Sequence, residues 1–321
     1  MKKILAASIM AVLPVLMAAP AAAQKYPERT VRMVVPFGAG GPADVFARIV
    51  AQSLSEETKV PFVIENRPGA GAVIGTDAVA KSTPDGYTLL VMSNTHTTNE
   101  SLLPNKPYDL MRDFLPVATL NYSDLIMVVH PSVPANTVAE FVALAKKDPG
   151  KLNYASSGPG TPYHMAGELF KSMSGTDIVH IPHKASGDAR NSVLSGNVQM
   201  MFDAVTTMTE LAKSGKVKAL GTTGLKRTPL TPDMPAVAEA VSGYEATIWL
   251  GVMAPKGTPP EVVTFLNTAI NKVINRAEVK EAWLKQGAIP MVKTPAEFEE
   301  YLKKDIEKWA AVVKASGAKV Q

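Results

Sequence analysis

An apolar run that passes into a glycine-rich turn and then a helical pattern, at residues 31–54, constrains the fold more than any other feature. Residues 33–35 have the pattern of a buried strand, and apolar residues recur at helical spacing over residues 46–54. Pro42 suits the first position of the helix because it has no N–H group to leave unpaired. The junction therefore predicts a strand, a turn and a helix, which together are the repeating unit of an α/β fold.

The turn itself predicts a site for an anion. Phe37, Gly38, Ala39 and Gly40 form a segment in which glycine lets backbone N–H groups approach a ligand closely. The unpaired N–H groups of the first helical turn, with the positive end of the helix dipole, favour a carboxylate or a phosphate there. Two alternatives remain open at this point. The glycines can serve a plain strand–helix connection, or residues 38–43 can be the G-x-G-x-x-A fingerprint of a dinucleotide site.

The first 23 residues have the pattern of a secretory signal. Lys2 and Lys3 precede an apolar stretch at residues 4–17, and a run of alanines ends at Ala23. We expect cleavage after Ala23 and a periplasmic protein. A transmembrane anchor is the alternative, but the stretch is short and ends in small residues typical of a cleavage site. Because soluble NAD is not expected outside the cytoplasm, export argues against the dinucleotide interpretation.

Composition and charge narrow the class of function. Without its first 23 residues the 321-residue chain has 298, a size at which a single hydrophobic core commonly divides into domains. Two of the 33 lysines and arginines lie in the signal, which leaves 31 basic against 29 acidic residues. That balance disfavours nucleic acid as a partner. The sequence has no cysteine for disulfides, thiol catalysis or a lipid anchor, and its histidines lack metal-ligand spacing, so neither metal nor cofactor is expected.

Strand and helix patterns alternate along the rest of the chain, which predicts an α/β architecture with largely parallel sheets. The chain is expected to cross between domains at residues 121–124, between extended segments at 117–120 and 125–129, and 246–253 is an extended return segment. The further strands are expected at 61–65, 87–92, 152–155, 178–181, 198–202 and 218–222. The further helices are expected at 73–81, 137–145, 188–194, 261–275, 277–286 and 295–315.

A second glycine-bearing loop repeats the design of the first. The strand at 152–155 is followed by Ser156, Ser157 and Gly158. Thr161 is then a good N-cap for a helix whose first residue is a proline. If the two loops face each other across a cleft, a molecule with a carboxylate at each end could be held from both sides.

A polar cluster at the carboxyl end of the third strand is another candidate. Ser93 and Thr95 belong to the segment Ser-Asn-Thr-His-Thr-Thr-Asn at 93–99. Ligands gather at such strand ends in open α/β sheets. An ordinary surface loop is the alternative, because serine, threonine and asparagine commonly fill loops.

Several motifs, in the same order along the chain, carry a resemblance to a known family. They are Val-Pro-Phe at 35–37 with its glycine turn, Glu-Asn-Arg-Pro-Gly-Ala-Gly at 65–71, Ala-Lys-Ser-Thr-Pro-Asp-Gly-Tyr at 80–87, Tyr-Ala-Ser-Ser-Gly at 154–158, Met-Met-Phe-Asp at 200–203 and Leu-Gly-Val-Met-Ala-Pro at 250–255. The chain resembles the Bug family, the periplasmic solute receptors of tripartite tricarboxylate transport systems. The resemblance implies a type II periplasmic-binding-protein fold, in which two α/β domains joined by a two-strand hinge enclose a ligand cleft.

The same resemblance implies the domains, the ligand class and the partners. Residues 24–124 and 246–321 are expected to form domain 1, and residues 125–245 domain 2. The implied function is capture of a small organic acid, a di- or tricarboxylate, aliphatic or aromatic, by domain closure. The receptor, expected to be a monomer, would deliver this acid to the integral membrane subunits of a tripartite tricarboxylate transporter. The competing class is a periplasmic hydrolase that uses a serine beside the second loop, although the G-x-S-x-G motif is absent.

The resemblance also implies site residues by position. Residues 37–40 match the first binding loop of the family, residues 156–161 contain the second, and Asp203 matches a pocket aspartate of the second domain. Capping of a helix is the alternative role for Asp203. Asp44 is expected to interact with its own helix terminus. The predicted ligand-binding set is Phe37, Gly38, Ala39, Gly40, Ser93, Thr95, Ser156, Ser157, Gly158, Thr161, His164 and Asp203.

Family members typically hold a ligand carboxylate with backbone groups and ordered water, without a fixed arginine. Two segments depart from the family pattern at positions that bear on specificity. Pro42 and Ala43 stand where a Gly-Thr pair is common. His183, Lys184 and Asp188 belong to a segment that is frequently Tyr-Lys-Gly-Ser-Ala-Pro in the family. The resemblance therefore predicts a carboxylate receptor without selecting the individual acid.

Overall fold

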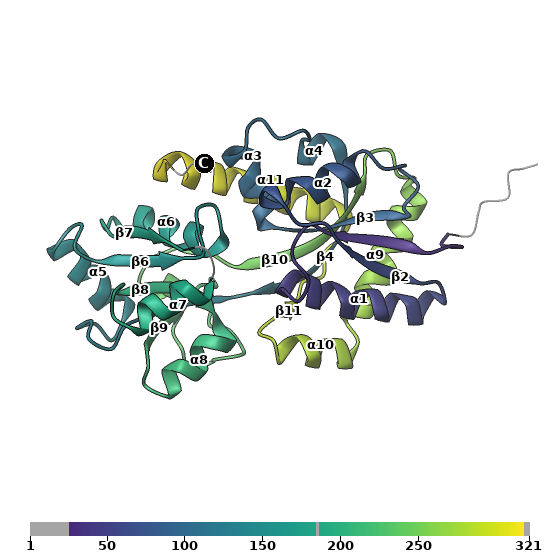
Figure 1. The fold of residues 1–321 in the computed structure, drawn as a ribbon. Helices are drawn as coiled ribbons and strands as arrows, with labels where there is room; N and C mark the ends of the chain where they lie inside the picture. Colours follow the sequence, from purple (N-terminus) through teal and green to yellow (C-terminus); the bar gives the residue numbers. More distant parts are fainter. Residues whose placement is uncertain (1–25, 184–185, 318–321) are drawn as a thin grey trace, which may run out of the picture.

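The computed structural model describes residues 26–183 and 186–317, which form two lobes, each built on one β-sheet (Figure 1). The expected signal, its cleavage after Ala23, and Lys184 of the divergent segment lie outside these residues. No helix within the described ranges is long and apolar enough to cross a membrane.

The first lobe contains a six-stranded sheet in the order β11-β4-β10-β3-β1-β2. Helices cover both of its faces: α1, α9 and α10 pack on one side, and α2, α4 and α11 on the other. The strands are β1 (Val31–Val35), β2 (Phe62–Asn66), β3 (Thr88–Ser93), β4 (Phe114–Ser123), β10 (Ile248–Pro255) and β11 (Ile289–Pro290). The helices are α1 (Pro42–Thr58), the 3-10 turn η1 (Ala70–Ala72), α2 (Val73–Ala80), α3 (Asn94–Leu102), α4 (Leu110–Asp113), α9 (Pro260–Ile274), α10 (Ala277–Leu284) and α11 (Pro295–Ser316).

The second lobe contains a five-stranded sheet in the order β7-β6-β8-β5-β9. Its helices α5 and α6 pack on one face, and α7 and α8 pack on the other. The strands are β5 (Leu125–Val129), β6 (Asn153–Ser156), β7 (Val179–Pro182), β8 (Met200–Ala204) and β9 (Lys218–Thr222). The helices are α5 (Val138–Lys147), α6 (Pro162–Ser174), α7 (Ser186–Leu194), α8 (Val205–Lys213) and the 3-10 turn η2 (Val237–Glu239).

Both sheets are mixed, so the expectation of largely parallel sheets is wrong. β1 is parallel to β2 and β3, and β6 is parallel to β7 and β8. However, β10 is antiparallel to β3 and β4, and β5 is antiparallel to β8 and β9. The antiparallel strands are those next to the crossings between the lobes. A strand that arrives from the other lobe enters its sheet from the opposite end, which the alternation of strand and helix patterns does not reveal.

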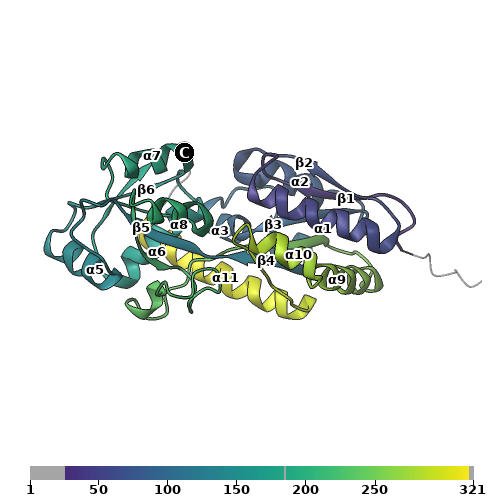
Figure 2. The same cartoon turned by 90° about the horizontal axis from the view of Figure 1, so that it is seen from below.

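Two crossings connect the lobes, as the fold class requires (Figure 2). At the first, β4 continues into β5 through Asp124. At the second, the chain returns into β10, and Ala246 N donates to Thr223 O at 3.0 Å. Thr223 also joins the first crossing, because Leu125 N donates to Thr223 Oγ1 at 2.8 Å and Thr223 N donates to Leu125 O at 2.9 Å. Hydrogen bonds therefore tie the two crossings together.

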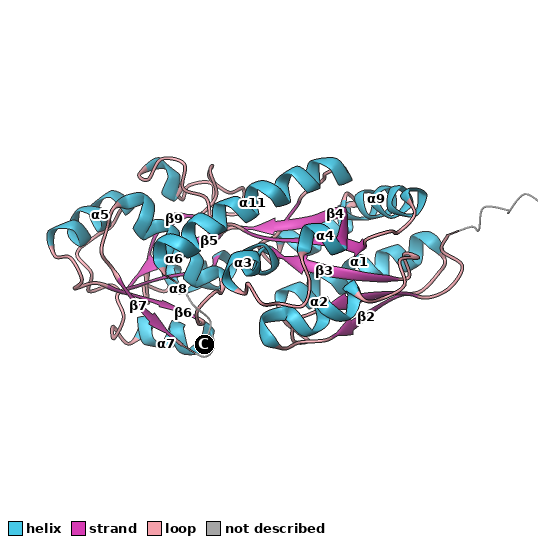
Figure 3. Cartoon of the chain, turned by 90° about the horizontal axis from the view of Figure 1, so that it is seen from above, coloured by secondary structure: helices cyan, strands magenta, loops and turns pink. Residues whose placement is uncertain are grey.

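Helix α11 provides a third link between the lobes (Figure 3). Phe298 and Leu302 near its beginning pack in the first lobe. Trp309, Val312 and Val313 near its end belong to the hydrophobic core of the second lobe. The expected boundary that assigns residues 246–321 to domain 1 stays a prediction, and packing shows that the end of this segment contacts both lobes.

Candidate ligand-binding cleft

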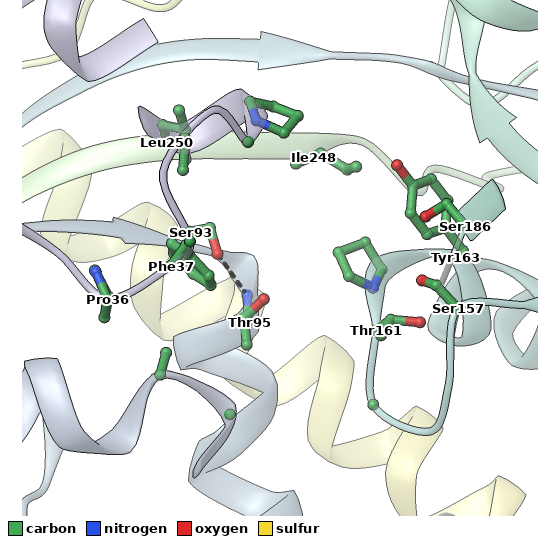
Figure 4. Close-up of a pocket in the computed structure, with 18 of the residues that line it drawn as sticks. Pro36, Phe37, Ser93, Thr95, Ser157, Thr161, Tyr163, Ser186, Ile248 and Leu250 are labelled. Atoms are coloured by element: carbon green, nitrogen blue, oxygen red, sulfur yellow. Dashed lines mark hydrogen bonds between the residues drawn. The ribbon is translucent and has the colours of Figure 1, made fainter. Parts of the chain in front are cut away.

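A cavity of about 1540 Å³ lies between the two lobes (Figure 4). This exceeds the roughly 300–1,000 Å³ typical of small-ligand pockets, so there is room for the lobes to move closer. Residues in the first turns of α1, α2 and α3 from the first lobe, and of α6, α7 and α8 from the second, line it. Of the predicted site residues, the cavity is lined by Phe37, Gly38, Ala39, Gly40, Ser93, Thr95, Ser157 and Thr161. The two glycine loops therefore face each other across one cleft.

The first loop is held in place by Asp44. Gly40 N donates to Asp44 Oδ2 at 2.9 Å, and Asn66 Nδ2 donates to Asp44 Oδ1 at 2.9 Å and to Phe37 O at 3.2 Å. Burial opposes ionisation of this carboxyl, but hydrogen bonds from Arg48, Gly40 and Asn66 outweigh burial and lower the pKa of Asp44. The prediction that Asp44 interacts with its own helix terminus is confirmed.

The beginning of α1 offers unpaired donors to the cavity. Its N-cap, Gly41, forms no side-chain hydrogen bond, and Pro42 occupies the first turn as predicted. Gly40 has a φ of +77°, a conformation that favours glycine. Gly38 has no positive φ, and a Cβ atom added there would meet no atom within 4 Å. A side chain at Gly38 would therefore occupy open space in the cleft.

The polar cluster at 93–99 forms helix α3, so the alternative of a surface loop is wrong. Ser93 Oγ accepts from Thr95 N at 3.2 Å, and Ser93 N donates to His96 Nδ1 at 3.1 Å. This reciprocal cap begins the helix without an apolar pattern. Burial lowers the pKa of His96 to about 4, so the ring is neutral. The rings of His96 and Phe37 form a T-shaped pair with their centroids 5.9 Å apart.

In and around the second loop, some residues line the cavity, and others lie behind them and support them through hydrogen bonds. Ser157 and Thr161 line the cavity, whereas Ser156, Gly158 and His164 do not. Ser156 Oγ accepts from Gly158 N at 3.2 Å and lies 2.6 Å from His180 Nε2. Thr161 Oγ1 donates to Gly158 O at 2.7 Å and accepts from His164 N at 3.4 Å. Ser156, Gly158 and His164 thus lie behind the cavity-lining residues Ser157 and Thr161, and their predicted contact with ligand stays a prediction.

Two neutral histidines support this loop from beneath. His164 Nδ1 accepts from Gly160 N at 3.1 Å, and the rings of His164 and His180 lie 4.1 Å apart between centroids. Burial is the main reason that the pKa of each falls from 6.5 to about 4, with Lys171 adding to the effect. Protonation of either ring would place a positive charge beneath the loop.

Stability should depend on these histidines in mildly acidic solution. A histidine with a lower pKa in the folded state takes up its proton more readily when unfolded, so its contribution is complete above pH 6.5 and declines toward pH 4. We expect the urea midpoint to fall between pH 7 and pH 5, and His164→Asn, which keeps an acceptor near Gly160 N, to reduce that fall. If the urea midpoint fell by the same amount in the variant and in the natural chain, this assignment would be contradicted.

Asp203 lies below the cavity surface, where it pairs with Arg190. Its side chain is 1% exposed, and Arg190 donates to Oδ2 from Nε at 3.0 Å and approaches it from Nη2 at 2.9 Å. Ala204 N donates to Oδ1 at 2.8 Å. Burial raises the pKa of Asp203 against the opposing effects of these partners. Both carboxylate oxygens already have donors, and Asp203 is not among the cavity-lining residues, so its predicted ligand contact stays a prediction.

Sequence reasoning missed a helix N-terminus on the second lobe. Thr206 and Thr207 in the first turn of α8 line the cavity, and Ala204 at the N-cap forms no side-chain cap. Tyr163 and Ser186 line the same side (Figure 4). The sequence did contain evidence for this part of the site, because the strand predicted at 198–202 leads directly into this segment and ligands gather at such strand ends.

A left-handed turn on the first lobe was also missed. Ala70, Gly71 and Ala72 have φ values of +47°, +63° and +79°, and all three line the cavity. The strained turn is fixed by Asn99 Nδ2, which donates to Gly71 O, and by Thr76 Oγ1, which donates to Ala72 O, both at 2.8 Å. Left-handed alanines are uncommon, and periodicity gives no sign of them.

The cavity holds no arginine among its described lining residues. Lys106 is paired with Glu100 at 3.0 Å and buried, and Lys285 is paired with Glu281 at 2.9 Å. Apolar walls come from Phe37, Leu102, Leu103, Val205, Ile248 and Leu250. A carboxylate in this cleft would meet N–H and hydroxyl groups beside apolar surface rather than an unpaired guanidinium. Within the described ranges, no group of three or more histidine, aspartate and glutamate side chains is placed to hold a metal ion.

Comparison with known proteins agrees with this geometry. Residues 46–318 match the family described as tripartite tricarboxylate transporter family receptor, TctC. The chain is 38% identical over 307 residues to Protein BugT of Bordetella pertussis, covering 95% of this chain and 94% of BugT. The structure of R. palustris Rpa4515 with adipate has a TM-score of 0.78 and 34% identity, covering 92% of this chain and 99% of that one.

Two further solved structures are similar. The periplasmic binding protein BugD has a TM-score of 0.75 and 35% identity, covering 92% of this chain and all of that one. MatC from Rhodopseudomonas palustris with bound malate has a TM-score of 0.74 and 30% identity, covering 90% of this chain and all of that one. The likeness extends over both lobes and the cleft between them.

Proposed function

The chain belongs to the tripartite tricarboxylate transporter receptor family, and from this premise we propose that it captures a small organic diacid by closing its two lobes. Receptors of this family bind solutes without transforming them, so the hydrolase alternative is wrong for this chain. In the proposed cycle, the exported receptor delivers the bound acid to the integral membrane subunits of its transporter as a monomer. Export with cleavage after Ala23 is part of this proposal.

One observation carries the proposal. Two helix N-termini without side-chain caps, α1 on one lobe and α8 on the other, line the same cavity from opposite sides. Backbone N–H groups at such ends favour anions, and the positive ends of the helix dipoles add to the attraction. A diacid can satisfy both ends at once, because each lobe would hold one carboxylate. Closure would then be driven by contacts that exist only when both lobes touch the ligand.

The apolar walls of the cavity favour a diacid whose two carboxylates are joined by an apolar body. Phe37 and Leu250 from the first lobe and Val205 from the second offer no hydrogen bonds to hydroxyl groups in the middle of a ligand. A hydroxylated ligand would lose water there without replacing its hydrogen bonds. The adipate bound by Rpa4515 is an unbranched diacid of this kind, and the malate bound by MatC is shorter and hydroxylated. We therefore propose aliphatic or aromatic diacids, with adipate as the first compound to test.

Titration calorimetry with adipate, malate and citrate tests the ligand class. We expect adipate to bind at least about fivefold more tightly than either hydroxylated acid, which corresponds to roughly 1 kcal/mol. Product analysis after incubation should recover the adipate unchanged. Tight binding of citrate together with no binding of adipate would refute the apolar-body assignment, and absence of binding by a broad organic-acid panel would refute the receptor proposal.

Closure can be measured directly by X-ray scattering. A saturating bound diacid should reduce the radius of gyration, because the loops around Gly38 and Ser157 approach each other while the crossings at Asp124 and Ala246 act as the hinge. Trp309 on α11 packs in the core of the second lobe, so closure should be a rotation about the side of the molecule where α11 lies. An unchanged radius at saturation would contradict closure.

A further inference from the structure

Asp124 is a buried carboxyl at the hinge of the cleft. It lies between the last residue of β4 and the first residue of β5, and it lines the cavity. It is 5% exposed. Thr223 ties the peptide that follows Asp124 to the second crossing through Leu125 and Ala246. A change in the charge of Asp124 therefore acts where both connections between the lobes meet.

The surroundings of this carboxyl favour its neutral form. Among the described residues, no lysine, arginine or histidine forms an ion pair with Asp124, and its buried Oδ1 has no hydrogen-bond partner. A Cβ atom on Gly224 would lie 2.9 Å from that oxygen, so the glycine lets the backbone approach the carboxyl. Burial, reinforced by the negative charge of Glu245, raises the pKa of Asp124 to about 6 despite a hydrogen bond from Thr228.

The titratable groups around Asp124 come from several parts of the fold. Tyr122 lies on β4. Burial is the main reason that the pKa of its phenol is raised, and the negative charge of Asp124 adds to this effect. Glu245 precedes β10 and lies 3.9 Å from Lys308 on α11, which offsets part of its charge. Arg227, beside Thr228, is engaged with Glu239 at 2.8 Å. Glu245 is therefore the acid that acts most directly on Asp124.

We propose that protonation of Asp124 favours closure of the cleft, so that the receptor holds its ligand more tightly in mildly acidic medium than in neutral medium. The remaining access of Asp124 to water is through the cavity that it lines. Closure removes this water and makes the charged carboxylate more costly, whereas the neutral acid loses little. The inference concerns regulation of the proposed binding site and rests on the proposed function.

The direction of the pH effect follows from proton linkage. If closure raises the pKa of Asp124 above its value of about 6 in this structure, the closed form binds more protons over the interval between the two values. Closure is then strongest below about pH 6 and weakens as the pH rises through the closed-state value. Each unit by which closure raises this pKa corresponds to a tenfold change in affinity at most.

Fluorescence energy transfer between the lobes can test this without relying on ligand. The natural chain has no cysteine, so Gln52→Cys on α1 and Ala143→Cys on α5 place one label on each lobe at exposed positions. Transfer efficiency would be recorded from pH 5 to pH 8, with no ligand and with adipate as the probe. Calorimetry with adipate over the same range would give the affinity.

In the natural chain we expect greater closure and roughly three- to tenfold tighter adipate binding at pH 5.5 than at pH 7.5. Asp124→Asn, which mimics the neutral acid, should remove this dependence. Any effect on the affinity that comes from ionisation of adipate itself would remain in both proteins. Glu245→Gln should move the midpoint to lower pH, because it removes a negative charge that favours the protonated form.

A pH profile that is flat in the natural chain, or the same in Asp124→Asn, would overturn the proposal. If Asp124→Asn fails to fold, an unmoved midpoint in Glu245→Gln would overturn it as well. Failure of the proposed function looks different: no acid would bind at any pH, while the ligand-free transfer efficiency would still titrate in the natural chain and not in Asp124→Asn.

Discussion

Replacing Asp305 by alanine is expected to lower the free energy of unfolding by about 3–5 kcal/mol. Asp305 on α11 is 7% exposed and accepts three hydrogen bonds from buried side chains. Thr97 Oγ1 and Trp249 Nε1 donate to Oδ2 at 2.6 and 3.2 Å, and Trp309 Nε1 donates to Oδ1 at 3.1 Å. Alanine would leave both indole N–H groups without a partner in the interior, whereas Thr97 Oγ1 would keep Asn94 O as an acceptor at 2.8 Å. Each such donor typically costs about 1–3 kcal/mol.

The position of Asp305 makes this loss more than a local one. Through Thr97 it holds α3, whose first turn lies in the cleft, and through Trp249 it holds the strand that returns across the hinge. Through Trp309 it supports the part of α11 that packs in the second lobe. A single buried carboxyl thus connects the cleft, the hinge and the helix that joins both lobes.

Urea unfolding followed by circular dichroism measures the loss. Asp305→Asn is the matched variant, because it preserves volume and one carbonyl oxygen, and it should lose less stability than alanine. Glu299→Gln on the same helix removes an exposed pair with Lys303 and should change stability by less than about 0.5 kcal/mol. A loss below 1 kcal/mol for Asp305→Ala would show that water or rearrangement satisfies the donors.

The regular elements were predictable because their signals are local. The strand at 218–222 matches β9, and the helix at 261–275 is α9 displaced by one residue, since apolar spacing and a preceding proline define its beginning. The N-cap role of Thr161 was likewise predictable. Such residues act on their own neighbours in sequence.

Features that depend on distant partners could not be predicted. Helix α3 has no apolar period and is held by its Ser93 cap and by Asp305, more than two hundred residues away. The side-chain direction of Asp203 depends on Arg190, and a strand end does not reveal that a buried ion pair has already engaged its carboxylate. The hinge carboxyl, Asp124, was placed at a crossing by its flanking strands, whereas its lack of a cation emerges only from the folded chain.

A receptor that holds its ligand without a fixed arginine should not need Arg48, Arg67 or Arg190 for binding. None of the three lines the cavity. Arg48 and Arg67 have side chains that are 52% and 42% exposed, and they pair with Asp44 and Glu65. Arg190 compensates the buried Asp203, so its removal would disturb folding irrespective of ligand. Arg48→Gln and Arg67→Gln are therefore the informative substitutions.

Gly38→Val is expected to weaken diacid binding by at least about tenfold, or roughly 1.4 kcal/mol. Gly38 lines the cavity beside the uncapped beginning of α1, so the valine side chain would occupy the space where a carboxylate approaches the backbone. A side chain at Gly38 meets no backbone strain, because the glycine of this loop with a positive φ is Gly40. The variant should consequently fold normally, which makes a loss of affinity a direct measure of the site.

Calorimetry with adipate would compare this variant with Gly38→Ala, which should lose less, and with Gly187→Val, where added atoms also meet open space but lie outside the cavity lining. Arg48→Gln and Arg67→Gln should each change affinity by less than about threefold, since a carboxylate held by backbone donors needs no bidentate guanidinium. Circular dichroism must first show native folding for every variant. If one arginine substitution abolished binding while Gly38→Val left it intact, the ligand charge would be held by a side-chain ion pair, and the glycine loop would not be the anion site.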